Sequence, residues 1–265
     1  MKPGLQWDPA AYAENSAMQH VWARELLAGL ALRGTERILD VGCGDGWVTA
    51  QIAQRVPHGR VVGVDISADM IRHARATFPS ARFPNLHFQE MDARNLQFRE
   101  AFEVVLSNAA LHWVDDHPAF LRGAAACLAP GGRLLVFCGG HGNAQEVFLA
   151  VRATLRQKPW RDFFRKLTRP YFFYDPSAYA RWLPDHGLTM RAVRVTHTEA
   201  VFPERAALAG WFRTTWLPYT QRVTPAARED FITAVLDHYL TQHPPNADGQ
   251  IRVKMVRLEI DGVKC

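Results

Sequence analysis

The sequence predicts an α/β fold, with a mostly parallel sheet that carries helices on both of its faces. Three observations lead to this prediction. Short apolar segments alternate with helical segments in the first half of the chain, their spacing is that of βαβ units, and a glycine-rich loop follows the first apolar segment. Because βαβ crossovers are right-handed, successive helices cover both faces of the sheet.

The elements of the first half follow from hydrophobic periodicity and capping signals. Apolar positions of one helix face, from Ala13 to Leu30, predict a helix over residues 10–32 that ends at Gly34. Ser67 is expected to cap the helix that carries Met70. The predicted strands are 37–41, 60–65, 86–90, 102–106 and 133–138, the other predicted helices are 47–55 and 118–128, and Pro130-Gly131-Gly132 is predicted to form a turn.

The alternation of strands and helices stops after Gly142. Residues 143–186 are rich in aromatic side chains and predict helices, 188–198 predict a strand, 204–243 predict further helices, and 250–260 predict a final strand. We expect the two helical pieces to form a lid over the carboxyl ends of the first strands, where open α/β sheets bind ligands. Residues 1–142 are thus the expected core and 143–265 the last strands with the substrate lid, in one compact unit.

Composition excludes several classes of protein. Of the 265 residues, 48% are hydrophobic and 22% are charged, which excludes a disordered chain and a collagen. The 4 cysteines form no CxxC motif, so we expect reduced thiols, no metal site and a cytoplasmic protein. No apolar run is long enough to span a membrane. The net charge of +5 favours a small acidic substrate, and the basic, aromatic stretch Lys158 to Arg169 is interpreted as a solvated, partly apolar helix face.

The loop from Gly42 to Gly46, with the pattern GxGxG, indicates the ligand. A Walker lysine is absent, which excludes a P-loop, and the spacing is one residue short of a dinucleotide motif. The acids Asp40 and Asp45 would repel a pyrophosphate and fit a cation better. Asp65, at the end of the second strand, can accept both hydroxyls of a ribose. S-adenosylmethionine, a ribonucleoside with a sulfonium and an ammonium group, matches this order of residues.

Four segments resemble the class I S-adenosylmethionine-dependent methyltransferases. They are LDVGCGDG, VVGVDIS, Met91-Asp92-Ala93 and LAPGG. The resemblance implies a three-layer, Rossmann-like sheet whose last strand is antiparallel, with helical lid insertions. It also implies a set of residues around the cofactor: Asp40, Gly42, Gly44, Asp65, Ile66, Met70, Asp92, Ala93 and Asn108. Met70 could equally be a plain core residue, whereas Asp45 is interpreted as a solvated acid at a helix start and Cys43 as a packing residue.

The segment SNAALHW, which follows the fourth predicted strand, indicates the class of methyl acceptor. It lacks the [DN]PP[YFW] tetrapeptide, which argues against methylation of base or glutamine nitrogens. Together with the opening WDPAAY and the following Asn15-Ser16 and Gln19, it resembles the small-molecule carboxyl methyltransferases of the trans-aconitate and juvenile hormone acid families. The resemblance implies that Gln19 and Trp113 hold the acceptor carboxylate, with His112 adjacent. A carboxylate is already ionised at neutral pH, so its methylation needs no base.

Two further groups of residues are assessed here. Asp115, Asp116 and His117 are interpreted as a solvated helix N-terminus. Arg213, Tyr219 and Arg222 are candidates for binding a second substrate carboxylate, although surface arginines over an aromatic core would have the same pattern.

The sequence leaves the acceptor and one other class of function open. The favoured function is methyl transfer to the carboxylate of a small-molecule acid by a monomer that binds neither membranes nor nucleic acid. A hydroxyl or carbon acceptor, with His112 as the base, is the first alternative. A non-catalytic cofactor- or RNA-binding protein is the second, and only the stretch Lys158 to Arg169 supports it.

Overall fold

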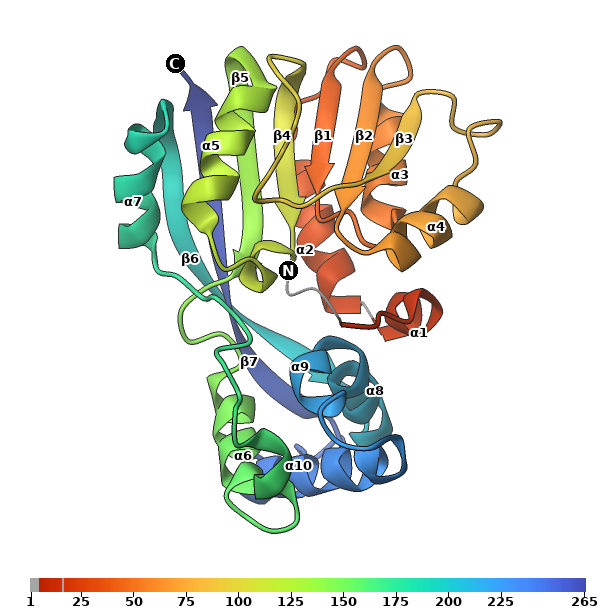
Figure 1. Ribbon diagram of the computed structural model, residues 1–265, viewed down its shortest axis with the longest axis vertical. Coiled ribbons are helices and arrows are strands. Elements are labelled where there is room, and N and C mark those ends of the chain that lie inside the picture. The colour runs from red at the N-terminus through yellow and green to blue at the C-terminus, as the bar shows by residue number, and fades with distance from the viewer. Residues whose placement is uncertain (1–4, 16) are drawn as a thin grey trace.

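A seven-stranded sheet organises the molecule (Figure 1). The computed structural model describes residues 5–15 and 17–265, and it describes their side chains except for those of residues 14–19. The strand order is β3-β2-β1-β4-β5-β7-β6, and β7 runs antiparallel to both of its neighbours. The remaining neighbours pair in parallel. The predicted α/β fold with an antiparallel last strand is therefore confirmed.

The strands and helices have the following bounds. The strands are β1 (Arg37–Val41), β2 (Arg60–Asp65), β3 (Leu86–Glu90), β4 (Phe102–Asn108), β5 (Leu128–Gly139), β6 (Leu188–Phe202) and β7 (Ile251–Lys264). The α-helices are α1 (Pro9–Asn15), α2 (Ala17–Ala28), α3 (Trp47–Arg55), α4 (Ala68–Thr77), α5 (His117–Cys127), α6 (Gln145–Leu155), α7 (Pro176–Asp185), α8 (Arg205–Thr215), α9 (Leu217–Thr220) and α10 (Arg228–Gln242). Short 3-10 helices occupy Leu111–Trp113, Trp160–Phe164 and Pro225–Ala227.

Helices cover both faces of the sheet. Apolar residues of α2, α3 and α4 pack with one set of strand residues, including Ile38 and Leu106, and α5 and α7 pack with the alternate set, including Leu39 and Val105. Because successive side chains of a strand point to opposite faces, this alternation produces two core layers. Ser67 caps α4 as predicted, since its hydroxyl oxygen accepts a hydrogen bond from the amide of Met70 at 3.3 Å.

The first helical segment and the glycine turn differ from the prediction. The structure has two helices, α1 and α2, and the second ends at Ala28 rather than near Gly34. Val21, expected on the buried face, is 42% exposed, while the neighbouring Trp22 is buried in a cluster that contains many aromatic residues. Residues 130–132 lie within β5 as a bulge, where the pairing with β4 jumps from Leu128 to Arg133.

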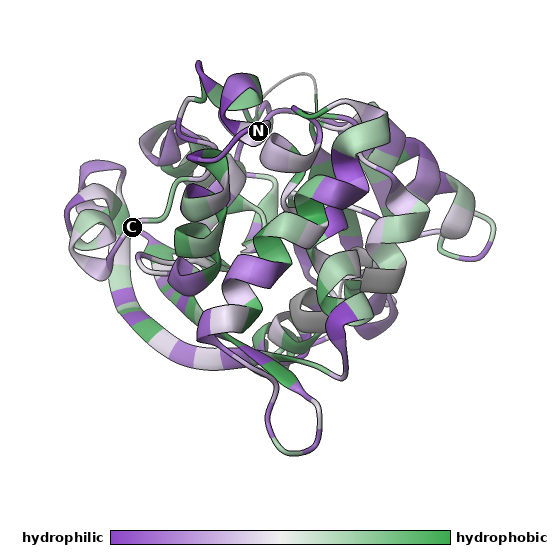
Figure 2. Ribbon diagram, turned by 90° about the horizontal axis from the view of Figure 1, so that it is seen from below, coloured by the Kyte–Doolittle hydropathy of each residue, from purple (hydrophilic) through white to green (hydrophobic). Residues whose placement is uncertain are grey.

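The second half of the chain divides between the sheet and a separate helical group. Both β6 and β7 extend beyond β5, and α6, α8, α9 and α10 gather below the carboxyl ends of the parallel strands (Figure 1). Figure 2 views the molecule from this side and shows both hydrophobic and hydrophilic residues on its helices; in α10 the buried positions are Phe231, Ile232, Val235, Leu236 and Tyr239, which form one helix face. The prediction that residues 143–186 belong wholly to a lid is wrong for α7, because its Tyr179 and Leu183 are buried against the sheet.

Two sequence interpretations concern surfaces. In the stretch Lys158 to Arg169, Trp160 and Phe164 are buried against Phe231 of α10, so its aromatic side belongs to a core and its charged residues face outward. In the part of the chain that the structure describes, no helix has both the length and the apolar character needed to span a membrane.

Candidate active site

The glycine-rich loop after β1 is held tightly against β2 and against the segment that follows β4. The amides of Gly42 and Cys43 both donate to the carbonyl of Val64 in β2, at 2.7 and 3.0 Å. Gly42 has a φ of +78°, and a Cβ atom on it would lie 2.2 Å from the Cβ of Ala110. Only glycine therefore fits this position, and the loop backbone stays open toward the carboxyl edge of the sheet.

Three carboxylates are buried around this loop. Asp40 is 1% exposed and accepts a hydrogen bond from the Thr49 hydroxyl at 2.7 Å. Burial, together with the nearby carboxylates of Asp65 and Asp45, raises the pKa of Asp40 to about 7, and the hydrogen bond from Thr49 opposes this shift. Asp45 is buried at 8% exposure, which corrects its interpretation as a solvated acid: the carboxylate bonds to the Trp47 amide but faces a cavity.

Asp65 links the loop to the next helix. One carboxylate oxygen accepts from the amide of Gly44 at 3.1 Å and the other from the amide of Ser67 at 2.9 Å. Burial raises the pKa of Asp65, and these amide donors oppose that effect. The carboxylate thus stands at the end of β2 with a fixed orientation, and its ribose-binding role stays a prediction.

These residues line what we call the acidic cavity, a space of about 620 Å³. Its lining comprises Trp7, Tyr12, His20, Asp40, Gly42, Cys43, Gly44, Asp45, Val48, Asp65, Met70, Asn108, Ala109, Ala110 and Trp113. The described lining contains three carboxylates and neither lysine nor arginine. Such a cavity suits a cation, so the sulfonium and ammonium groups of S-adenosylmethionine fit the residues present.

An apolar slot of about 290 Å³ adjoins the acidic cavity. Ile66 and Ala93 line the slot together with Leu111 and Val114, and Asp65 and Gly42 line both spaces. This slot suits the flat adenine ring expected next to Ile66. Met70 lines the acidic cavity and is also buried against neighbouring apolar groups, so the two interpretations of this residue are compatible.

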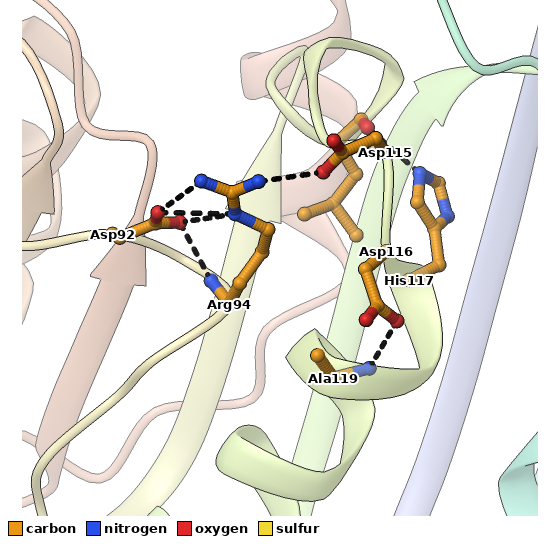
Figure 3. A network of polar contacts seen from close by, with 7 residues as sticks. Asp92, Arg94, Asp115, Asp116, His117 and Ala119 are labelled. Atoms are coloured by element: carbon orange, nitrogen blue, oxygen red, sulfur yellow. Dashed lines mark hydrogen bonds and ion pairs between the residues drawn. The ribbon is translucent and has the colours of Figure 1, made fainter. Parts of the chain in front are cut away.

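Asp92 is directed toward an arginine rather than into these cavities (Figure 3). Its carboxylate accepts from Nη2 of Arg94 at 2.6 Å, and the same guanidinium donates to Asp115 at 2.9 Å. These contacts account for the lowered pKa of Asp92, because the Arg94 hydrogen bonds outweigh the effect of its partial burial. The Asp92 side chain is absent from the described cavity linings.

The helix start at Asp116 and His117 is only partly solvated, which corrects the interpretation of this cluster (Figure 3). Asp116 is the expected cap and accepts from the amide of Ala119 at 2.8 Å. His117, however, is fully buried between the Tyr179 hydroxyl at 2.6 Å and the carbonyl of Leu111 at 2.8 Å. Burial lowers the pKa of His117 to about 4, so it is a neutral core residue.

A second space, the aromatic cavity, lies beside the acidic cavity and also has a volume of about 620 Å³. Its lining comprises Trp7, Tyr12, Trp22, Ala109, His112, Trp113, Asn143, Ala144, Phe148, Tyr171, Phe173, Trp211, Thr215, Trp216 and Met255. Trp7, Tyr12, Ala109 and Trp113 line both cavities, so a ligand in one can reach a ligand in the other. Ala109 adopts a left-handed φ of 53° at this junction, a conformation that costs an alanine about 1 kcal/mol.

His112 contributes a neutral ring to the aromatic cavity. Its Nδ1 atom accepts a hydrogen bond from the amide of Gly139 at 3.3 Å. Burial lowers the pKa of His112 to about 3, with a smaller contribution from His117. A neutral imidazole that accepts at Nδ1 carries its proton on Nε2, so the other nitrogen is a donor and not a base.

The three predicted substrate-binding residues are not brought together. Arg213 donates to both oxygens of Glu229, at 2.8 and 2.6 Å, on the outer surface of α8. Arg222 donates to the carbonyl of Lys166 and lines a separate groove with Arg228. Tyr219 is buried among aromatic rings and lies outside the described lining of the aromatic cavity.

The last predicted site residue is Gln19, and several residues that were not predicted also line the site. The side chain of Gln19 lies outside the described residues. His20, which follows it, lines the acidic cavity and lies beside Trp47, with 4.2 Å between the ring centroids and an angle of 32° between the ring planes. Trp7 and Tyr12 also line the site, and the WDPAAY motif was the signal that could have found them. Within the described chain, no three His, Cys, Asp or Glu residues converge as a metal site would require.

Comparisons with known proteins add the following findings. The family described as Methyltransferase domain matches residues 38–132. Trans-aconitate 2-methyltransferase of Shigella flexneri serotype 5b is 30% identical over 256 residues, which cover 96% of this chain and 96% of that relative. A protein of the same name from Escherichia coli O1:K1 has the same identity and coverage.

Solved structures share the fold. YcgJ from Bacillus subtilis superposes with a TM-score of 0.63 at 20% identity, over 92% of this chain and 98% of that chain. A geranyl diphosphate methyltransferase, solved in complex with GPP and sinefungin, gives a TM-score of 0.56 at 17% identity, over 98% of this chain and 84% of that chain.

Proposed function

Because the chain belongs to the class I S-adenosylmethionine-dependent methyltransferases, we propose that it transfers the methyl group to the carboxylate of a small-molecule acid. The chain is an enzyme that uses S-adenosylmethionine as its methyl donor. When bound, this donor supplies a methyl group on a positively charged sulfur. Our proposal concerns the acceptor atom. The names of the relatives, which refer to trans-aconitate, support a carboxylate oxygen as this acceptor.

The observation that carries the proposal is the junction of the two cavities, which offers no base. The acidic cavity suits the cationic donor, and the aromatic cavity meets it at Ala109 and Trp113. The imidazole of His112, which lines the aromatic cavity, is neutral and carries its proton on Nε2, because the Gly139 amide occupies Nδ1. A carboxylate needs no deprotonation, so alignment and exclusion of water are sufficient for catalysis.

The proposed roles of the chain's residues follow from this arrangement. Asp40 and Asp65 balance the charge of the donor, and Tyr12 and Trp7 cover it from the N-terminal segment. We propose that the His112 N–H donates to a carboxylate oxygen and that Trp113 shields the reacting atoms from water. Gln19 is proposed as a second donor to that carboxylate, on the resemblance alone.

We propose that residues 143–265 provide the lid of this site, apart from α7. Phe148 of α6 and Trp211 of α8 line the aromatic cavity, as does Trp216 just after α8. These aromatic side chains come from helices below the sheet, so their closure on the parallel strands would exclude water. The monomeric state and the cytoplasmic location stay predictions from the sequence.

A labelling experiment tests the acceptor. The purified enzyme is incubated with methyl-labelled S-adenosylmethionine and with acids or matched alcohols, and the product is treated with base. Methyl esters hydrolyse in base, whereas ethers and C-methyl products do not, so base-labile label is the expected result. Base-stable label would identify the hydroxyl or carbon alternative, for which the described site offers His112 only in its donor form.

A further inference from the structure

The aromatic cavity has a charge pattern that separates it from the acidic cavity. None of the described residues that line it is a lysine, arginine, aspartate or glutamate. Rings form its walls: Tyr171 and Phe173 are parallel to within 3°, and Phe148 lies 4.5 Å from Trp216 between centroids. Because the faces of aromatic rings are electronegative, such walls favour an apolar body and disfavour an anion.

Two arginines that lie near this cavity are paired with carboxylates. Arg257 lies over the ring of Trp22 at 5.7 Å, but it is buried behind that ring and paired with Glu259 at 2.6 Å and Glu25 at 2.5 Å. Arg213 is paired with Glu229 at 2.6 Å on the surface. No lysine or arginine is thus among the described residues that line the cavity, and Arg222 and Arg228 line a separate groove.

Three polar groups of the cavity are engaged with the backbone. The Thr215 hydroxyl donates to the carbonyl of Trp211 at 2.6 Å, and the Tyr171 hydroxyl donates to the carbonyl of Thr215 at 2.8 Å. The amide oxygen of Asn143 accepts from the amide of Val256 at 2.9 Å. The indole N–H of Trp22, in contrast, is buried and has no hydrogen-bond partner among the described residues. The described cavity thus offers neutral donors, such as this indole N–H, and no charged one.

We propose that the acceptor is an apolar monocarboxylic acid, whose single carboxylate faces the junction and whose hydrocarbon body fills the aromatic cavity. This inference rests on the proposed function. A second carboxylate would lose its hydration without gaining a cation, which is costly in a buried site. The chain would then differ in substrate from the relatives named for trans-aconitate, an acid with three carboxylates.

Matched pairs of acids test the proposal. The enzyme is assayed for base-labile methyl product with decanoate against decanedioate, cinnamate against 4-carboxycinnamate, and trans-aconitate. We expect kcat/KM for each monoacid to exceed that of its diacid by about 100-fold. Equal or better turnover of diacids or of trans-aconitate would overturn this inference and leave the proposed function intact. Base-stable label would overturn both.

A binding measurement covers the case in which none of these acids is methylated. The same acids are titrated into enzyme saturated with S-adenosylhomocysteine, with quenching of tryptophan fluorescence as the signal. Tighter binding of the monoacids supports the inference independently of turnover. Absence of binding, or equal binding of mono- and diacids, contradicts it.

Two neighbouring positions of α6 provide a matched pair of variants. Phe148 lines the cavity, whereas Leu149 is 55% exposed on the outside of the same helix. Phe148→Ala is expected to raise KM for the best monoacid about 10-fold, Phe148→Leu to restore most of it, and Leu149→Ala to change nothing. An unchanged KM in a folded Phe148→Ala protein would contradict the proposal.

Discussion

Asp40 is expected to make the affinity for S-adenosylmethionine depend on pH. Its pKa is raised to about 7 by burial, with the Asp65 and Asp45 carboxylates adding to the effect. The cationic ligand favours the ionised form of Asp40. A pKa of about 7 then implies affinity about 10-fold weaker at about pH 6 than at about pH 8, since the ionised fraction changes by that factor.

The assay is a calorimetric titration of the enzyme with S-adenosylmethionine at both pH values. Asp40→Asn provides the baseline, because it retains the ligand's own titration and any contribution of His20, whose pKa is lowered by burial. The uncharged sulfur of S-adenosylhomocysteine should give a smaller pH effect than the sulfonium. If the wild type bound equally well at both pH values, or if Asp40→Asn kept the full dependence, this reasoning would be refuted.

The raised pKa of Asp40 also predicts a pH-dependent effect on folding stability. Ionisation of Asp40 favours ligand binding but destabilises the folded protein. The pKa of Asp40 is about 7 in the folded protein, above its ordinary value of 3.8, so the folded state binds the proton more strongly. Its contribution to stability is therefore complete below about pH 4 and is lost as the pH rises through about 7. At about pH 8, ligand-free Asp40→Asn should be more stable than the wild type, by up to about 4 kcal/mol in chemical unfolding.

Three further predictions concern the loop, the surface and the pH profile. Gly42→Ala should abolish cofactor binding and lower the free energy of unfolding by more than about 2 kcal/mol, measured by chemical unfolding. Gly131 is the control, because it has a similar φ of +73° but nothing lies within 4 Å of an added Cβ; Gly131→Ala should cost about 1 kcal/mol. Arg213→Ala should leave kcat and KM within about 2-fold, because the arginine pairs with Glu229 on the surface, and a large rise in KM would contradict its placement. With both substrates saturating, kcat should be flat from about pH 6 to about pH 9, because the pKa of His112 is about 3; a rise with a midpoint near neutrality would point to a base.

The sequence alone determined the parallel strands of the sheet and the glycine loop and acids that line the acidic cavity. A strand, a glycine loop and a helix follow one another within residues 37–55, so their geometry depends on local interactions that a short segment contains. The acid at the end of β2 could be placed from the same reasoning, because parallel strands end at one edge of the sheet. Strand bounds such as Arg37–Val41 and Leu86–Glu90 agree with those predicted.

Only the tertiary structure decided what surrounds the methyl acceptor. The aromatic cavity combines Trp7, Phe148 and Trp216, which are distant in the sequence, and periodicity cannot tell which rings face a cavity and which fill a core. Charge pairing also depends on the tertiary structure. The sequence offered Arg213 as a ligand for a carboxylate, but Arg213 is paired with Glu229. Burial of His117 likewise depended on a tyrosine of α7. Local signals specify elements, whereas long-range packing decides which side chains remain available to a substrate.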